Sequence, residues 1–204
     1  GQVYFLREML ASKGETIEGK NCAISGSGNV AQYCAQKVLG YGGKVITMSD
    51  SGGYIFDKEG IDESKLDWIM DLKNNRRGRI KEYVKEYPGA VYREGERPWG
   101  EVCDVALPSA TQNEIEVKGA TNLVKNGCMA ISEGANMPTS PEAYTVLSDA
   151  GVLFGPAKAA NAGGVAVSAL EMSQNASFDE WTSKKVDSKL DQIMTGIHKQ
   201  CADA

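Results

Sequence analysis

Short apolar runs alternate with segments of helical periodicity along most of the chain. The first clear unit starts with the apolar run 21–25, which ends at Gly26. In the next segment, 29–39, apolar residues recur every four positions on one helical face, and 44–49 again has the character of a buried strand. A strand, a glycine-rich turn, a helix and a second strand within residues 21–50 predict two parallel strands joined by a right-handed crossover.

The same alternation continues to residue 154. Further strands are predicted at 54–56, 102–107, 128–132 and 152–154, and a turn at 57–60 suggests a small hairpin. Helices are expected at 3–12, 62–86, 114–126 and 140–151, of which 62–86 is long, highly charged and expected on the surface. The pattern predicts an α/β fold, a Rossmann-like, doubly wound and mostly parallel sheet with helices on both faces.

The end of the chain has a different pattern, with helices and no strands. Residues 161–175 are nearly all small or apolar, and apolar residues then recur at helical spacing over 186–201. Ser177 and Glu180 have the spacing of a capping box before the last helix. We therefore expect one domain over 1–176, with 177–204 as a C-terminal helix of the same domain.

Composition and charge narrow the range of partners. A chain of 204 residues is long enough to bury roughly 70% of its unfolded surface without a disulfide or metal. The net charge of −5 disfavours nucleic acid and anionic membranes, which require clustered cations. No signal peptide and no apolar run of about 18 residues is visible. The five cysteines form no CxxC pair, which favours reduced thiols in a cytoplasmic protein without a bound metal.

A glycine-rich loop follows the first predicted strand of the parallel sheet and leads directly into a helix. Residues 26–31 read GSGNVA and match the pattern G-x-G-x-x-[GA]. The first glycine permits the sharp turn, the second lets a pyrophosphate approach the backbone, and the small sixth residue lets helix and strand pack closely. The helix N-terminus then offers free N–H groups to the phosphates. The predicted dinucleotide-binding residues of this loop are Gly26, Ser27, Gly28, Asn29 and Val30.

The residues after the second predicted strand bear on the choice between NAD and NADP. Asp50 stands where an acid usually accepts a hydrogen bond from the adenosine ribose, which favours NAD. Ser51 follows, and four cations cluster in the next helix, where they could hold a 2′-phosphate and favour NADP: Lys73, Arg76, Arg77 and Arg79. These cations could equally form a solvated helix face, so the residues alone leave the choice open.

Two further loops follow predicted strands. Thr111 and Gln112 come after strand 102–107, and Asn136 comes after strand 128–132. In a doubly wound sheet, ligands bind beyond the carboxyl ends of the strands, where these uncharged side chains would suit ribose, amide and phosphate oxygens. The same residue types also serve as ordinary loop caps.

Five separated stretches, in order along essentially the whole chain, closely resemble the nucleotide-binding half of glutamate dehydrogenase. They are GSGNVAQY at 26–33, PSATQN at 108–113, EGANMP at 133–138, GPAKAANAGG at 155–164 and VAVSALEMSQN at 165–175. The resemblance implies a C-terminal nucleotide-binding domain, with Ala110 in the cofactor loop and with Asn136 and Asn161 near the nicotinamide. It also implies that Ser168 helps to bind the side-chain carboxylate of glutamate and that Val165 lines the same pocket.

The resemblance also implies an activity for the full-length enzyme, the reversible NADP-dependent oxidative deamination of L-glutamate to 2-oxoglutarate and ammonia. Residues 49–51 with Lys73, Arg76 and Arg79 are similar to NADP-linked members, with NAD as the alternative. The catalytic lysine and aspartate of the family lie in an N-terminal domain that no segment here matches. We therefore expect a fragment without catalytic residues, inactive alone, from an enzyme that forms a homo-hexamer.

Two other functions are compatible with the sequence. The first is an amino-acid dehydrogenase for another substrate, of the leucine or phenylalanine type, in which an apolar side chain would give the hydroxyl of Ser168 nothing to bind. The second is a non-catalytic module that binds the nucleotide only.

Overall fold

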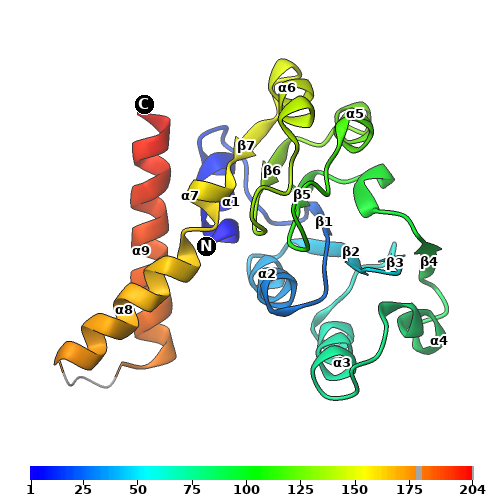
Figure 1. Ribbon diagram of the computed structural model, residues 1–204, viewed down its shortest axis with the longest axis horizontal. Coiled ribbons are helices and arrows are strands. Elements are labelled where there is room, and N and C mark those ends of the chain that lie inside the picture. Colours follow the sequence, from blue (N-terminus) through cyan, green and yellow to red (C-terminus); the bar gives the residue numbers. More distant parts are fainter. Residues whose placement is uncertain (178–180, 204) are drawn as a thin grey trace.

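A seven-stranded sheet forms the centre of the computed structural model, which describes residues 1–177 and 181–203 (Figure 1). The strand order is β4-β3-β2-β1-β5-β6-β7, in which β1, β2, β5, β6 and β7 pair in parallel and β3 and β4 are antiparallel. The strands are β1 (Asn21–Ile24), β2 (Lys44–Asp50), β3 (Gly53–Phe56), β4 (Val91–Glu94), β5 (Val105–Leu107), β6 (Ala130–Ser132) and β7 (Leu153–Gly155). The predicted mostly parallel α/β sheet is confirmed.

Helices cover both faces of this sheet. They are α1 (Gln2–Ala11), α2 (Asn29–Gly40), α3 (Glu63–Asn74), α4 (Tyr83–Glu86), α5 (Val117–Lys125), α6 (Pro141–Asp149), α7 (Ala157–Ala160), α8 (Gly163–Ser177) and α9 (Ser183–Ala202), with 3-10 turns η1 (Ile80–Glu82) and η2 (Pro98–Gly100). The inner sides of α1, α2 and α3 are buried in one core, to which they contribute Leu6, Ala35 and Ile69, respectively. Leu123 and Leu147 place α5 and α6 in a second core, on the opposite face (Figure 1).

The hairpin and the charged helix differ from the sequence prediction. The hairpin turn is Ser51-Gly52, which pairs β2 with β3, whereas 57–60 leads into α3. The helix expected over 62–86 stops at Asn74, and Arg77 has a left-handed φ of 51°. The charged residues continue at helical spacing past Asn74, although the helix ends there, so the charge pattern alone did not reveal the break. The prediction also missed β4, because three of its four residues are exposed and alternate too little to stand out.

The last helix packs against the first. Met194 of α9 is fully buried in the core that α1 shares with the sheet. Arg7 of α1 donates to Asp191 at 2.7 Å, and Asp187 accepts from Lys37 of α2 at 2.8 Å. In Figure 1, α8 and α9 extend to one side of the sheet. The boundary at 176/177 stays a prediction.

The capping box predicted from Ser177 and Glu180 stays a prediction, because Glu180 lies outside the described residues. The helix α9 begins at Ser183, and the side chain of Thr182 accepts a hydrogen bond from the backbone N–H of Lys185.

Replacing Met194 with alanine tests whether α9 unfolds together with the sheet. We expect Met194→Ala to lower the free energy of unfolding by about 2–5 kcal/mol, because it empties a packed site in the shared core. The matched control is Gln192→Ala, an exposed position on the same helix, which should shift stability by no more than about 0.5 kcal/mol. Urea unfolding followed by far-UV and near-UV signals measures both; a separate transition for α9 would contradict the prediction.

Candidate functional site

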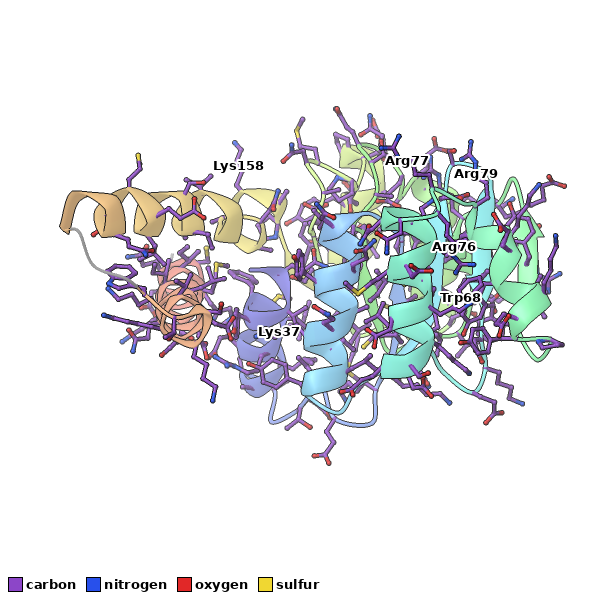
Figure 2. All side chains as sticks on the ribbon, turned by 90° about the horizontal axis from the view of Figure 1, so that it is seen from below. Lys37, Trp68, Arg76, Arg77, Arg79 and Lys158 are labelled. Atoms are coloured by element: carbon purple, nitrogen blue, oxygen red, sulfur yellow. The ribbon has the colours of Figure 1, made fainter. Side chains whose placement is uncertain are left out.

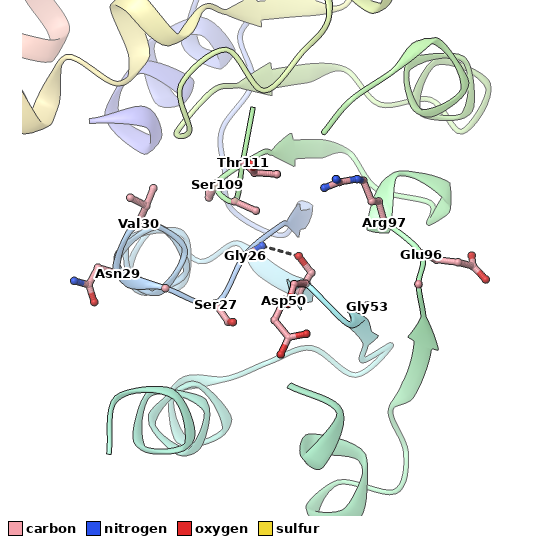
Figure 3. A pocket seen from close by; sticks show the side chains of 15 residues that line it. Gly26, Ser27, Asn29, Val30, Asp50, Gly53, Glu96, Arg97, Ser109 and Thr111 are labelled. Carbon is pink, nitrogen blue, oxygen red and sulfur yellow. Dashed lines mark hydrogen bonds between the residues drawn. The ribbon is translucent and has the colours of Figure 1, made fainter. Parts of the chain in front are cut away.

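A cleft of about 700 Å³ opens at the carboxyl ends of β1 and β2 (Figure 3). Its walls come from the glycine loop, the end of β2, the segment after β4 and the loop after β5. The lining residues are Gly26, Ser27, Gly28, Asn29, Val30, Ser49, Asp50, Ser51, Gly53, Gly95, Glu96, Arg97, Ser109, Ala110 and Thr111. The predicted loop residues 26–30, together with Asp50, Ser51, Ala110 and Thr111, are thus brought together.

A second hollow of about 410 Å³ continues this cleft toward β6. The two share Val30 and residues 109–111, and the second adds Gln112, residues 134–136 and Asn161. The side-chain amide of Asn161 donates to that of Asn136 at 3.2 Å. The structure therefore joins the two asparagines that the sequence places far apart, at the opposite end of the groove from Asp50.

Gly26 is required by the backbone itself. Its φ is 84°, and a β-carbon there would lie 2.9 Å from the carbonyl oxygen of Ser109. Ser49 of β2 fixes the turn from the other side, because its hydroxyl accepts from the Gly26 N–H at 2.7 Å and its own N–H donates to the Gly26 carbonyl at 3.0 Å. The sharp turn is therefore held between β2 and the loop after β5.

Gly28 has no such structural reason. A β-carbon on Gly28 would meet no atom within 4 Å, and its φ of −82° suits any residue. It precedes α2 as the N-cap, and no side chain caps the first turn of that helix. Uncapped N–H groups and the positive end of the helix dipole therefore face the cleft beside a bare backbone, an arrangement that fits a diphosphate.

Gln32, which the sequence reasoning missed, supports the loop from below. Its amide, on the buried side of α2, donates to the Ser27 carbonyl at 2.8 Å and exchanges hydrogen bonds with Asn74 at the end of α3. A polar residue on the otherwise apolar face of α2 was the available signal.

The carboxylate of Asp50 already has hydrogen-bond partners within the chain. One carboxylate oxygen accepts from the Gly52 N–H at 2.8 Å, and the other accepts from the Ile80 N–H at 3.0 Å. The ammonium of Lys73 lies 3.6 Å from the second oxygen, and the side chain of Asp50 is only 8% exposed. Beside it, the guanidinium of Arg79 donates to the Ser51 hydroxyl at 2.8 Å. Lys73 and Arg79 thus gather at the rim formed by the end of β2.

Arg76 does not join this group. Its guanidinium lies over the Trp68 ring, 4.6 Å from the ring centre, and its Nε lies 2.8 Å from a carboxylate oxygen of Asp71 (Figure 2). Both partners belong to α3, so the arginine, which follows the end of this helix, packs back against it. Our sequence-based grouping of Arg76 with Lys73 and Arg79 is not seen in the structure.

Two buried carboxylates hold the loops after β5 and β6, and neither was predicted. Glu114 accepts at one oxygen from the N–H groups of Ala110 and Thr111, at 3.0 and 3.2 Å. Glu133 accepts at one oxygen from the Thr139 N–H and at the other from the Ala157 N–H, at 3.2 and 2.6 Å. Burial raises the pKa of both carboxyl groups above the ordinary value. In the sequence, the feature that could have identified them is that each lies beside a loop that follows a predicted strand.

The residues predicted to bind substrate lie apart from both hollows. Val165, which is 77% exposed, and Ser168 stand on the solvent-facing side of α8, shortly after Asn161. Neither lines the cleft or its continuation. Their side chains are free to meet another surface, and their predicted role stays a prediction.

The described ranges, 1–177 and 181–203, contain neither a candidate metal site nor a candidate membrane-spanning helix. No group of three or more histidine, cysteine or acidic side chains there is placed to hold a metal ion. No helix in these ranges has the length and apolar character needed to cross a bilayer. The cysteines are free thiols, four of them buried and Cys201 exposed.

Comparison with known proteins gives one consistent family. The profile of the glutamate/leucine/phenylalanine/valine dehydrogenase family matches residues 1–204. The chain is 59% identical over 201 residues to the glutamate dehydrogenase of Bacteroides thetaiotaomicron, covering 98% of the chain and 45% of that protein. It is 50% identical over 203 residues to the NADP-specific glutamate dehydrogenase of Escherichia coli, covering 100% of the chain and 45% of the relative.

Solved structures agree with the sequence relatives. The glutamate dehydrogenase of Plasmodium falciparum superposes with a TM-score of 0.96 at 46% identity, over 99% of this chain and 43% of that one. The chain therefore spans less than half the length of the relatives it matches.

The two buried carboxylates should respond in opposite ways to replacement by glutamine. In Glu133→Gln the new NH₂ group faces a backbone N–H, so one hydrogen bond is lost and a buried donor is left unpaired. We expect a loss of about 1–3 kcal/mol in the free energy of unfolding. In Glu114→Gln the amide oxygen keeps both N–H bonds and the buried charge is removed, so stability near pH 7 should be unchanged or higher.

The pH dependence of unfolding checks the sign of this contrast. A raised pKa means that the folded state binds the Glu114 proton more tightly than the unfolded chain does. The stability from this group is therefore complete below the unfolded pKa of about 4.3 and is lost as pH rises through the folded pKa. In urea titrations, wild type should lose stability relative to Glu114→Gln over this range; a constant difference would contradict the assignment.

Proposed function

Because the chain belongs to the glutamate/leucine/phenylalanine/valine dehydrogenase family, we propose that it binds a nicotinamide dinucleotide in the cleft at the ends of β1 and β2. The observation that carries the proposal is the open space around Gly28 at the uncapped N-terminus of α2. Protein packing does not require a glycine there, whereas a diphosphate lying against the backbone does. The adenosine end would lie toward Asp50 and the nicotinamide end toward Asn136 and Asn161.

We propose NADP as the preferred cofactor, with NAD as the alternative. The carboxylate of Asp50 already accepts from Gly52 and Ile80 and faces Lys73, so little of it remains for a ribose 2′-hydroxyl. The hydroxyl of Ser51 and the 60%-exposed side chain of Arg79 stand beside it, a hydrogen-bond donor and a cation suited to a 2′-phosphate. The relative from Escherichia coli is named NADP-specific, and that from Xylanibacter ruminicola NAD(P)-specific.

For the full-length protein we propose reversible oxidative deamination of L-glutamate to 2-oxoglutarate and ammonia. When bound, the dinucleotide supplies the hydride acceptor. Asn136 and Asn161 would orient the nicotinamide, and the exposed hydroxyl of Ser168, with Val165, would meet the substrate side chain. A glutamate carboxylate gives that hydroxyl a partner, which an apolar substrate would not.

The proposed reaction also requires residues of the full-length enzyme that lie outside this chain. Acid–base catalysis would come from residues outside residues 1–204, so the chain alone is expected to bind the cofactor without turnover. We further propose that the full-length enzyme is cytoplasmic and homo-hexameric.

Alanine at the two loop glycines separates folding from binding. Gly28→Ala should leave the free energy of unfolding within about 0.5 kcal/mol of wild type, because its β-carbon meets no protein atom. It should nevertheless weaken dinucleotide binding strongly, since the methyl group occupies the diphosphate position. Gly26→Ala, the comparison, should be destabilised by about 1–3 kcal/mol through its positive φ and its contact with Ser109. Calorimetric titration with NADP+ and urea unfolding measure both; full affinity in Gly28→Ala would refute the proposed site.

Cofactor preference is tested by titrating wild type and three cation variants with NADP+ and NAD+. We expect tighter binding of NADP+, and a loss of about tenfold in NADP+ affinity in Arg79→Ala or Lys73→Ala, since each removes a charged contact. Arg76→Ala is the charge-matched control and should bind as wild type does, because Arg76 packs on Trp68. NAD+ affinity should change little in all three. Equal affinities for the two cofactors in wild type would overturn the NADP assignment.

A further inference from the structure

Arg97 is a cleft residue that no sequence motif suggested. It follows β4, and Figure 3 shows its side chain pointing into the cleft toward Ser109 and Thr111, while Glu96 points away. Among the described residues that line the cleft, Arg97 is the one cation. Its side chain is 53% exposed, so its guanidinium remains accessible to a ligand.

A buried carboxylate stands behind this arginine. The second oxygen of Glu114 has no hydrogen-bond partner, and the Glu114 side chain is wholly buried. It lies 3.9 Å from Nη1 of Arg97, which is too long for a hydrogen bond but close enough for electrostatic attraction. Glu114 therefore attracts the guanidinium without using its donors. Within the described part of the chain, the Arg97 side chain makes no hydrogen bond.

The rest of the cleft indicates what Arg97 would contact. Under the proposed function, the N-terminus of α2 takes the diphosphate, and Ser51 with Arg79 takes the 2′ position. The remaining wall consists of residues 95–97 facing residues 109–111, where the other side chains are short apart from the outward-pointing Glu96. Among the described residues, no aromatic side chain lines the cleft. The guanidinium of Arg97 is therefore the flat, delocalised side-chain group in this wall that could cover a base.

We propose that Arg97 binds the adenine ring by stacking its guanidinium plane on the base, with Glu114 as the positioning residue behind it. The inference rests on the proposed dinucleotide site and deepens it. Arginine stacks on aromatic faces through its flat, delocalised cation, whereas the compact ammonium of lysine does not reproduce this contact. The adenine is common to NAD and NADP, so Arg97 contributes affinity without choosing between them.

The test uses calorimetric titration of Arg97→Ala and Arg97→Lys with NADP+ and NAD+. Arg97→Ala should weaken both dinucleotides by the same factor, about 5- to 20-fold, as expected for a partly desolvated cation–π contact. Arg97→Lys keeps a cation beside Glu114, which protects the fold, and should recover little of the affinity. The matched control is Arg93→Ala, which removes the same charge four residues earlier on β4, outside the cleft, and should bind as wild type does.

Three results would overturn the inference. A loss confined to NADP+ would assign Arg97 to the 2′-phosphate, and full recovery in Arg97→Lys would assign it to a phosphate charge. Unchanged binding in Arg97→Ala would exclude any role in the cleft. If wild type itself binds neither dinucleotide, the proposed function fails; if wild type binds and Arg97→Ala matches it, only the role of Arg97 fails.

Discussion

The reciprocal hydrogen bonds between Gly26 and Ser49 fix the geometry on which the site depends. They join the end of β1 to β2 at the point where the chain must turn sharply, and the carbonyl of Ser109 closes the turn from the other side. The direction of that turn aims the N-terminus of α2 into the cleft. The hydroxyl of Ser25 extends the same network by accepting from the Ser109 N–H. Three neighbouring strand ends are thus held in one rigid arrangement before any ligand arrives, which reduces the entropy lost on binding.

The strand-end loops face a common physical problem, which buried acids solve. Irregular backbone lacks the regular partners of a helix or sheet, and a buried N–H left unpaired is destabilising. Glu114 and Glu133 each supply acceptors for two such N–H groups from loops on either side of β6. The parts of these loops that line the groove, residues 109–112 and 134–136, can then consist of uncharged residues, because the two carboxylates lie beneath them.

Short-range patterns in the sequence were enough to predict those strands and helices whose burial repeats at a regular period. The unit from β1 to β2 was predictable because strand, glycine loop and helix have distinct periods, and the interior positions of its strands are continuously buried. The edge strand β4 escaped, since exposure on an edge removes the alternation that marks a strand. Spacing placed Asp50 and Ser51 at the end of a strand, where both line the cleft, and their role in binding stays a prediction. Arg76 was grouped with Lys73 and Arg79, whereas its side chain packs on Trp68, because sequence gives the direction of a long side chain poorly. Gln32, Glu114 and Arg97 were missed because their roles arise only from contacts between distant segments.

The distribution of ionisable groups defines what the cleft can do. Asp50, Glu96 and Arg97 are its charged lining residues; Asp50 is held by backbone N–H groups and Lys73, and Glu96 points outward. A general acid or base must be free to exchange a proton with a reacting atom. Asp50 is constrained by these contacts, and the guanidinium of Arg97 carries N–H donors and no acceptor. The described cleft is therefore suited to binding and orienting a ligand rather than to transferring protons.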